Sequence, residues 1–487
     1  MLQNLLRGGI RASVRKGSSP MGVAACPGAR FLGGGVEETS LKSLLSNSDF
    51  DRNNDEDVRD VGNLRKTFSG FFKRPPSERK MLLEEVFPGV DMEPLEAALP
   101  MEIADMMIEN AVGGVTLPLG VAPNFVINGE HFIVPMAVEE PSVIAAASSI
   151  AKLVSENGGF RAKSTDNIMT SQVQILDVND ADAAVKTISE NRSALIEAAN
   201  AFCVSSVKRG GGVRDIYPRL IIPRVNPQRD PYIVVHIDVD VCEAMGANIV
   251  NTIAEGIAPR LADLVGGRPA LRILSNLCLK RRSGAAFRIP YDALSWKGVD
   301  GETVASRVME AYLFAEDDPY RAATHNKGVM NGIDSAAIAM GQDWRAIEAS
   351  CHAAAAHGGA YGSMTKYSME DGYLLGKLEM PMACGSKGGA LTTHPLYKLT
   401  HKLLGYPDAK SICQILVAVG LAQNFAAIRA LAIEGIQKGH MNLHARNICL
   451  NAGVPNELVD ECREFMTLRN KWDTATAQEF MASKNVA

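Results

Sequence analysis

The chain has 487 residues, of which 46% are hydrophobic and 22% are charged, and its net charge is −5. Such a chain is expected to fold into about two to four packed units, and its charge gives no reason to expect a nucleic-acid partner. The nine cysteines are scattered and form no C-x-x-C pair, which argues against a disulfide framework or a zinc site and favours a reducing compartment. Polar residues interrupt the apolar runs before they reach the ~18–20 residues that span a bilayer, so we expect no membrane span.

The first 36 residues are basic. They contain five Arg or Lys residues, no acidic residue and several serines, and Leu2, Leu5 and Ile10 can share one helical face. This composition is typical of an organellar transit peptide, so we expect the matrix of a mitochondrion or a related organelle, and otherwise the cytoplasm. A disordered basic tail is the alternative. Residues 37–60 then turn acidic, which indicates a linker.

The next segments indicate two helices and a buried strand. Helical patterns begin near Ser77 and again at 100–110, and residues 132–138 are typical of a strand. The strand leads into a Glu-Glu-Pro-Ser sequence at 139–142 and then an alanine-rich helix. A carboxylate at this junction can be stabilised by the helix N-terminus, so Glu140 is a candidate catalytic residue. A simple capping role is the alternative.

From about residue 168 the pattern changes to strand, helix, strand, strand and helix. Residues 232–241 alternate strictly, with aliphatic side chains on one face and His236, Asp238 and Asp240 on the other, which indicates a half-buried strand. No G-x-G-x-x-G sequence follows a strand, so a Rossmann site is not expected. The order predicts a compact α+β unit inserted in a larger domain. Its other expected elements are a strand at 171–178, a helix at 181–202 and a helix ending near 264.

The second half contains one polar segment with little hydrophobic periodicity, residues 320–334. We interpret it as a loop whose Arg, Lys and Asn side chains hold a carboxylate and polarise a carbonyl; a solvated loop is the alternative. The last 50 residues indicate a separate small helical piece. Further expected elements are a helix at 306–314, a strand at 373–380, a glycine-rich loop at 385–389 and a long apolar helix at 411–436.

Three further polar residues are candidates by their positions. Asp343 precedes a helix, where it can cap the N-terminus or orient a lysine. His440 and His444 are four residues apart and would share one face of a helix. That spacing suits a metal, but the H-E-x-x-H pattern is absent. A proton-donating histidine, a metal pair and two ordinary surface histidines therefore all stay open.

Six motifs in matching order resemble the soluble, class II 3-hydroxy-3-methylglutaryl-CoA (HMG-CoA) reductases, and the resemblance covers about residues 64–468. Each motif is several residues long, so six in order are hard to obtain by chance. The motifs are Ile108-Glu109-Asn110-Ala111-Val112-Gly113, Glu139-Glu140-Pro141-Ser142, Ala244-Met245-Gly246-Ala247-Asn248, Ala323-Thr324-His325-Asn326-Lys327-Gly328, Gly341-Gln342-Asp343-Trp344-Arg345 and Gly439-His440-Met441.

The resemblance implies a catalytic role for each of four residues. Glu140 matches the catalytic glutamate, and Lys327 matches the lysine that polarises the thioester oxygen. Asp343 matches the aspartate that links the two, and His440 matches the histidine that protonates the departing CoA thiolate. Reduction of a thioester to an alcohol needs an oxyanion partner and two proton sources, and these side chains supply them without a metal. The implied substrate-binding residues are Ser142, Arg321, Asn331 and Lys73.

The resemblance also implies a nicotinamide cofactor in the inserted unit. Glu243 replaces the usual aspartate of the family, and Cys203 stands where NAD-using relatives carry an aspartate for the adenosine ribose. Without that acid a 2′-phosphate is not repelled, and Lys208 and Arg209 lie nearby in the sequence, so NADPH is favoured and NADH is possible. The implied cofactor contacts are Glu243, Met245, Gly246, Asn248, Asn276, Gln423 and Cys203.

The implied fold is α+β, with a large mixed helix-and-sheet substrate domain, an inserted ferredoxin-like cofactor domain and a C-terminal helical flap. The implied assembly is a homodimer or a multiple of it, with active sites between subunits. The expected divisions are 1–60 (transit peptide and linker), 61–167 with 276–436 (substrate domain), 168–275 (cofactor domain) and 437–487 (flap).

The expected reaction is the NAD(P)H-dependent reduction of HMG-CoA to mevalonate and free CoA, a step toward isoprenoid precursors. Two alternatives remain. The same site can oxidise mevalonate in a catabolic pathway, because a catalyst accelerates both directions. A CoA-ester-binding protein that no longer reduces its ligand is the other alternative, although the four catalytic residues are intact.

Overall fold

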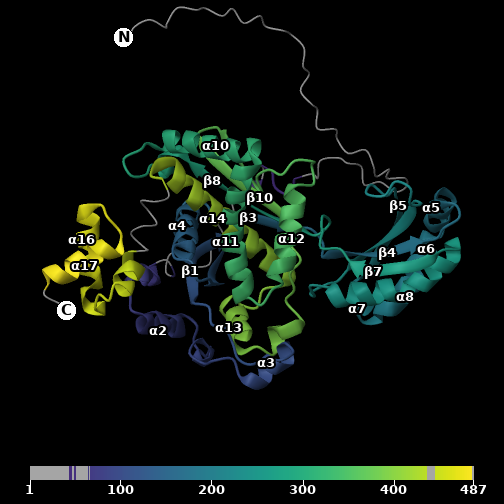
Figure 1. Ribbon diagram of the computed structural model, residues 1–487, viewed down its shortest axis with the longest axis horizontal. Coiled ribbons are helices and arrows are strands. Elements are labelled where there is room, and N and C mark those ends of the chain that lie inside the picture. The colour runs from purple at the N-terminus through teal and green to yellow at the C-terminus, as the bar shows by residue number, and fades with distance from the viewer. Residues whose placement is uncertain (1–42, 47–48, 51–63, 65, 436–444, 485–487) are drawn as a thin grey trace, which may run out of the picture.

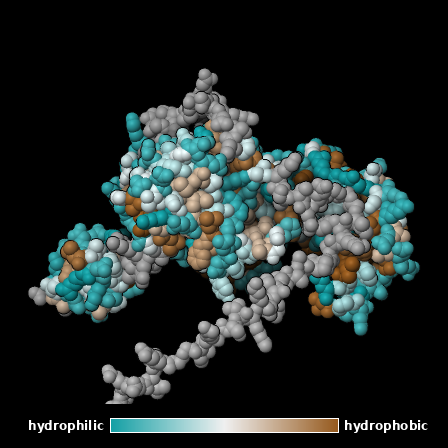
Figure 2. Space-filling view, turned by 90° about the horizontal axis from the view of Figure 1, so that it is seen from above, coloured by the Kyte–Doolittle hydropathy of each residue, from teal (hydrophilic) through white to brown (hydrophobic). Residues whose placement is uncertain are grey.

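The structure is a computed structural model that describes residues 43–46, 49–50, 64, 66–435 and 445–484. Figure 1 shows a central body with a smaller unit on each side: the inserted unit in teal, and the C-terminal helices α16 (Val459–Arg469) and α17 (Thr474–Ser483) in yellow. In Figure 2 apolar patches are scattered over these units between hydrophilic areas. The expected transit peptide lies outside the described residues and stays a prediction.

The body is built from a four-stranded antiparallel sheet, a separate hairpin and the helices packed on them. The sheet has the order β3-β8-β10-β9. Its strands are β3 (Arg161–Ser164), β8 (Arg282–Pro290), β9 (Thr365–Glu370) and β10 (Tyr373–Pro381). The helices are α2 (Pro76–Val86), α3 (Met101–Met107), α4 (Val143–Ser155), α9 (Tyr291–Leu294), α10 (Gly301–Asp317), α11 (Pro319–Ala339), α12 (Trp344–Ala355), α13 (Pro395–Leu403) and α14 (Ala409–Ile433). Short 3-10 turns are η2 (Phe71–Lys73), η3 (Glu93–Leu95) and η5 (Gly389–Thr392), with η6 (Asn456–Leu458) in the C-terminal unit.

The hairpin of β1 (Leu119–Ile127) and β2 (Glu130–Ala137) has a tight turn set by its sequence. Ile127 pairs with Glu130, so only Asn128 and Gly129 form the turn. Both have positive φ, 52° and 85°, and Asn-Gly is the pair that tolerates this conformation most readily. The strand β2 ends at Ala137, two residues before the glutamate pair at 139–140.

The long apolar helix α14 is the centre of the body. It has the length and mean hydropathy of a membrane-crossing helix, contrary to the expectation that no apolar segment of the sequence is long enough. Within the structure, however, α14 packs against α4, α10, α11 and β8, and 67% of its most apolar window is buried. Its hydrophobic surface is thus used in packing inside the body.

The inserted unit has the ferredoxin-like order β-α-β-β-α-β. Its antiparallel sheet has the order β5-β6-β4-β7, so the first strand lies between the third and the fourth. Helices α5, α6 and α8 pack on the sheet around one apolar core. The elements are β4 (Ile168–Leu176), α5 (Ala181–Glu190), α6 (Arg192–Asn200), η4 (Ala201–Cys203), α7 (Val204–Lys208), β5 (Gly212–Ile221), β6 (Tyr232–Asp240), α8 (Ala247–Val265) and β7 (Arg268–Leu274).

Two local expectations for this unit were wrong. The single helix expected at 181–202 is divided between α5 and α6 at Asn191, whose φ and ψ of −91° and 7° are not helical. The polar face of β6 is also less exposed than a half-buried strand predicts, because Asp238 is only 1% exposed. A buried carboxylate needs partners, and Asp238 has them: it accepts from Thr170 Oγ1 at 2.6 Å and pairs with Lys280.

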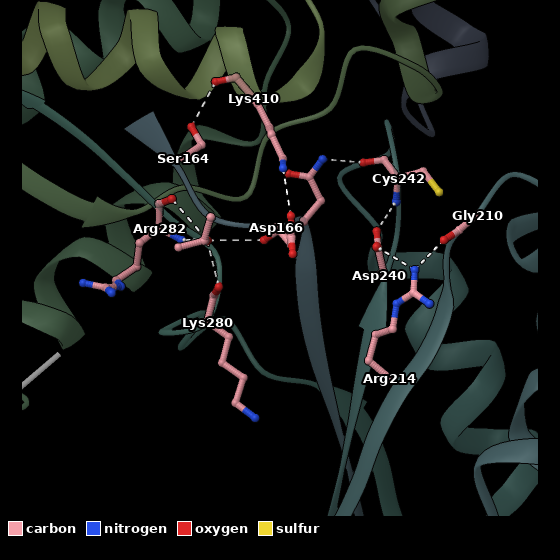
Figure 3. Close-up of polar contacts among 11 residues, drawn as sticks. Ser164, Asp166, Gly210, Arg214, Asp240, Cys242, Lys280, Arg282 and Lys410 are labelled. Atoms are coloured by element: carbon pink, nitrogen blue, oxygen red, sulfur yellow. Dashed lines mark hydrogen bonds and ion pairs between the residues drawn. The ribbon is translucent and has the colours of Figure 1, made fainter. Parts of the chain in front are cut away.

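The chain crosses from the body into the inserted unit before β4 and returns after β7, and these two crossings lie side by side (Figure 3). Asp166, on the first crossing, forms an ion pair with Lys410 at the start of α14, with 2.9 Å between Oδ1 and Nζ. On the side of the inserted unit, Asp240 accepts from Cys242 N at 3.1 Å and pairs with Arg214 at 3.0 Å. Asn167, on the first crossing, donates from Nδ2 to Cys242 O at 2.7 Å, which ties the segment after β6 to the junction.

Candidate active site

Glu140 lies at the junction between β2 and α4. The residue that caps α4 is Ser142, which has a positive φ of 82°. A serine in this left-handed region is strained by about 1–3 kcal/mol, and such strain is concentrated at functional sites. Its hydroxyl oxygen is buried and has no hydrogen-bond partner among the described residues. The junction therefore presents a carboxylate and an unsatisfied hydroxyl together.

Lys327 reaches Glu140 from α11. The distance between Lys327 Nζ and Glu140 Oε2 is 3.0 Å, and the two side chains are 61% and 36% exposed. An ion pair this exposed contributes at most about 1 kcal/mol to folding. The pair lies close enough to act together on a bound carbonyl, with the ammonium as oxyanion partner and the carboxyl as proton source.

The polar segment expected to be a loop is helical, because α11 covers all of it. The opposite face of α11 packs closely on α14: a side chain on Gly332 would meet Gln423 Cβ at 2.8 Å. Buried polar residues find partners at the start of β9, as His325 Nε2 lies 2.6 Å from Oγ1 of Thr365, the first residue of that strand. Periodicity missed this helix because its first half is buried largely through polar side chains with tertiary hydrogen bonds, and the large apolar residues of its buried side begin only at Val329.

Asp343 occupies the N-cap of α12. Its Oδ1 accepts from Ala346 N at 3.1 Å and lies 3.8 Å from the Arg345 guanidinium. Within the described residues the structure does not bring Asp343 into hydrogen-bond contact with Lys327 or Glu140. Of the two roles predicted for Asp343, the helix cap is formed, whereas the link to Lys327 and Glu140 stays a prediction.

The predicted substrate-binding residues are distributed over the same region. Arg321 and Asn331 lie on α11, on either side of Lys327, and Asn331 is one turn beyond the lysine. The Arg321 guanidinium is half-buried, which lowers its pKa, and no acidic side chain pairs with it in the described part of the chain. Lys73 lies in η2, with its ammonium 5.8 Å from the Phe72 ring centre. An unpaired guanidinium suits a carboxylate ligand.

The start of α8 fits an anionic cofactor group. Gly246 caps this 19-residue helix with a φ of 108°, no side chain bonds the cap, and the first turn holds no acidic residue. Free N–H groups and the helix dipole at such an end favour a phosphate. Asn248 is exposed in this turn, and the buried Gln423 Oε1 has no partner among the described residues. Asn276 is exposed just after β7.

Glu243 and Cys203, the two departures from the family pattern, are both engaged within the protein. Glu243 Oε2 accepts from Ala409 N at 2.9 Å and from the Ser386 hydroxyl, so its longer side chain reaches the start of α14. Cys203 is 4% exposed in the core of the inserted unit, which leaves little thiol surface for a ribose. Nearby, Arg209 bonds Ser206 Oγ at 3.3 Å.

His440 lies outside the described residues, as does His444, so their roles stay predictions. The eight described cysteines are free thiols. In the described part of the chain no group of three or more His, Cys, Asp or Glu side chains is placed to hold a metal ion.

The fold and this site indicate an enzyme: an exposed lysine–glutamate pair in the body could act on a carbonyl, and a helix N-terminus in the inserted unit suits a phosphate-bearing cofactor. The profile of the family "Hydroxymethylglutaryl-coenzyme A reductase" matches residues 75–445. The chain belongs to this family.

Relatives and solved structures agree over most of the chain. It is 43% identical over 429 residues to the 3-hydroxy-3-methylglutaryl-coenzyme A reductase of Archaeoglobus fulgidus, covering 86% of this chain and 96% of that protein. A Streptococcus pneumoniae reductase structure matches with a TM-score of 0.73 and 37% identity, over 85% of this chain and 99% of the other. Another, a class II enzyme from that organism bound to NADPH in open conformations, has a TM-score of 0.71 and 38% identity, over 75% and 99%. These matches confirm the class II assignment and the α+β fold.

Proposed function

We propose that the chain reduces HMG-CoA to mevalonate and free CoA, using two molecules of NADPH. The observation that carries the proposal is the exposed Lys327–Glu140 pair, 3.0 Å apart, in a chain of the HMG-CoA reductase family. A bound nicotinamide supplies the hydride in each of the two steps. The protein must then stabilise an oxyanion and move protons to the alcohol oxygen and to the departing thiolate.

Lys327 is placed to stabilise the oxygen of the thioester and of the hemithioacetal that follows. Its ammonium is not enclosed, so a substrate carbonyl can approach it, and a positive charge at the developing oxyanion lowers the barrier. Glu140 is within hydrogen-bonding distance of the same ammonium and is the proposed proton source for that oxygen. His440 is the proposed donor to the CoA sulfur.

The carboxylate of the hydroxymethylglutaryl group is the proposed partner of Arg321. The guanidinium has no acidic partner among the described residues, and the buried Ser142 hydroxyl likewise lacks a hydrogen bond there. A ligand that supplies acceptors would satisfy both groups. Asn331, on the same helix as Lys327, and Lys73 complete the proposed substrate contacts.

The direct test is a reductase assay with HMG-CoA and NADPH, in which NADPH consumption and mevalonate formation are both measured. We expect about two NADPH consumed per mevalonate, because a thioester needs two hydrides to become an alcohol. Acetyl-CoA, which lacks the free carboxylate of HMG-CoA, is the matched control and should turn over much more slowly. Binding of HMG-CoA without NADPH consumption would contradict the proposal and favour a CoA-ester-binding protein.

NADPH is the proposed cofactor in preference to NADH. The segment after η4 carries Ser206, Lys208 and Arg209 and no acidic side chain, so a 2′-phosphate meets positive charge rather than repulsion. A ratio of kcat/KM for the two cofactors that favours NADPH supports this. The Arg209→Ala variant should reduce the preference, and a wild-type preference for NADH would contradict it.

A homodimer is the proposed assembly. The segment between α3 and β1 exposes aliphatic side chains that a monomer gains nothing by exposing: Val112 and Val115 are 97% and 96% exposed, and Ile108 is 58% exposed. Contiguous exposed apolar side chains mark interaction surfaces. Light scattering should give the mass of a dimer or a multiple of it, and Val112→Asp with Val115→Asp should shift the mass toward the monomer.

Import into a mitochondrion or a related organelle is the proposed fate of the chain, on the basic and acid-free composition of residues 1–36. A fluorescent protein fused after residues 1–60 should enter the organelle. The same fusion with its N-terminal arginines replaced by glutamate should stay in the cytoplasm. Cytoplasmic location of the first fusion would contradict the proposal.

A further inference from the structure

Each of the predicted catalytic residues Lys327 and Asp343 directly follows a buried carboxamide residue. The first is Asn326, which is 0% exposed, and the second is Gln342, which is 8% exposed. A buried amide side chain needs both its donor and its acceptor satisfied. Both residues bond backbone groups of another segment, so each carboxamide fixes its catalytic neighbour to a different part of the chain.

Asn326 holds Lys327 within the body. Its Nδ2 donates to Gly362 O at 2.9 Å and its Oδ1 accepts from Met364 N at 2.9 Å. Both partners lie just before β9, a strand of the body's own sheet. This anchor therefore stays inside one structural unit.

Gln342 instead holds the segment of Asp343 to the loop after β10. Its Nε2 donates to Gly385 O at 3.0 Å, and its Oε1 accepts from Gly385 N at 2.9 Å. These two hydrogen bonds go to one residue, so they act as a two-point clamp, and Nε2 also donates to Met340 O at 3.2 Å within its own segment. Gly385 in turn lies against the predicted cofactor loop, because a Cβ on it would be 2.5 Å from Met245 N.

Arg281 holds the same two loops from the other side. Its side chain is among the largest fully buried ones, and the residue is 2% exposed. Its Nη1 donates to Met245 O at 2.8 Å, and its Nη2 donates to Ala244 O at 3.3 Å and to Cys384 O. A buried guanidinium without an acidic partner is tolerable only when carbonyls accept its protons. Here those carbonyls come from the predicted cofactor loop and from the loop that Gln342 clamps.

We propose that Gln342 and Arg281 are positioning residues that fix the loop of Met245 and Gly246 relative to Asp343, and so set the approach of the nicotinamide to the thioester. This inference rests on the proposed reductase function. Neither side chain needs to touch the substrate for this role. Hydride transfer requires reacting atoms roughly 3–3.5 Å apart, and a displacement of about 1 Å can lower the rate roughly 100-fold. The clamp itself lies in the body, and the contacts of Gly385 and Arg281 with the loop of Met245 connect it to the inserted unit, across which this distance is set.

The test is the Gln342→Met variant, which keeps the length and burial of the side chain and removes both hydrogen bonds to Gly385. We expect kcat for HMG-CoA reduction to fall roughly 10- to 100-fold, while the KM for HMG-CoA stays within about 2-fold, because the substrate contacts lie elsewhere. Amide hydrogen exchange in the peptide 243–248 should become faster, because one anchor of that loop is lost.

The matched control is Thr400→Val, which removes a buried hydrogen bond of 2.8 Å to Ala339 O. This bond ends on the last turn of α11, close in sequence to Gln342, but it involves neither the loop of Met245 nor the loop of Gly385. We expect this variant to lose some stability while keeping the wild-type kcat and the wild-type exchange of 243–248. A control that slows kcat as much as Gln342→Met would overturn the positioning role, since general destabilisation would then explain both.

Arg281→Lys is the second variant, and it applies the same test should Gln342→Met not fold. It keeps the buried charge but cannot reach all three carbonyls, so we expect a fall in kcat of roughly 10-fold and faster exchange in 243–248. Unchanged kcat or unchanged exchange in the folded variants overturns the inference. The exchange measurement needs no substrate, whereas a wild-type protein that does not reduce HMG-CoA would overturn the proposed function instead.

Discussion

The two sides of the predicted catalytic site, on α11 and on α12, differ in how far they are assembled. On α11, Lys327 already contacts Glu140, with 3.0 Å between Nζ and Oε2. On α12, Asp343 uses Oδ1 to cap its own helix, and Oδ2 accepts no hydrogen bond from a described residue. Packing of α11 against β2 and α4 brings the first pair together. If the predicted link between Asp343 and Lys327 forms, a further event such as substrate binding must bring Oδ2 to the lysine.

Lys327→Ala tests the assembled side and should have the largest effect. Removing an ammonium that stabilises an oxyanion lowers kcat by about 10²- to 10³-fold or more, measured as NADPH consumption with HMG-CoA. The matched control is Lys366→Ala on β9, which also removes an exposed lysine paired with a glutamate, Glu316. Near-normal turnover in the Lys327 variant, or an equal loss in the control, would refute the assigned role.

His440→Gln separates the thioester step from the aldehyde step. Reduction of HMG-CoA should slow by roughly 100-fold, the range expected for loss of a general acid. Reduction of free mevaldehyde should be affected much less, because no thiolate leaves and none needs a proton. Equal losses with both substrates would count against protonation of the sulfur.

Two variants of Asp343 separate its role as a helix cap from the role of its negative charge. Asp343→Asn keeps an N-cap side chain, so stability should change little, whereas Asp343→Ala should cost roughly 1 kcal/mol of unfolding free energy. If the free oxygen joins Lys327 in the substrate complex, both variants should lose at least about 10-fold in kcat. Full activity in Asp343→Asn would mean that the residue only caps α12.

The contact between α11 and α12 itself predicts a pH effect on stability. Burial and the neighbouring Glu348 raise the pKa of Asp334 from 3.8 to about 8. Between these values the folded state holds a proton that the unfolded state has lost. The free energy of unfolding should therefore fall as the pH rises toward about 8 and level off above it.

Urea unfolding at several pH values between about pH 5 and pH 8 measures this effect. Asp334→Asn keeps the shape of the side chain and removes its titration, so its stability should vary less over the same range. A wild-type slope equal to that of the variant would show that Asp334 does not carry the proton.

The sequence predicted most elements whose periodicity is local. Strands such as β6 and β10 and helices such as α8 and α14 lie close to their expected ranges, because alternation and apolar repeats report directly on burial. Periodicity did not predict α11, where Asn326 and His325 are buried and hydrogen-bonded to the chain around the start of β9. Polar side chains satisfied by distant partners leave no periodic signal.

What the sequence alone determined is the family, because six multi-residue motifs in order specify it without any contact being known. It also identified Glu140 and Lys327, which are 187 residues apart. The tertiary structure decided which of the predicted residues meet: Glu140 contacts Lys327, whereas Asp343 caps a helix. It alone revealed Arg281 and the clamp of Gln342, since a buried guanidinium is recognised by the carbonyls folded around it. Those carbonyls belong to segments that no local pattern connects.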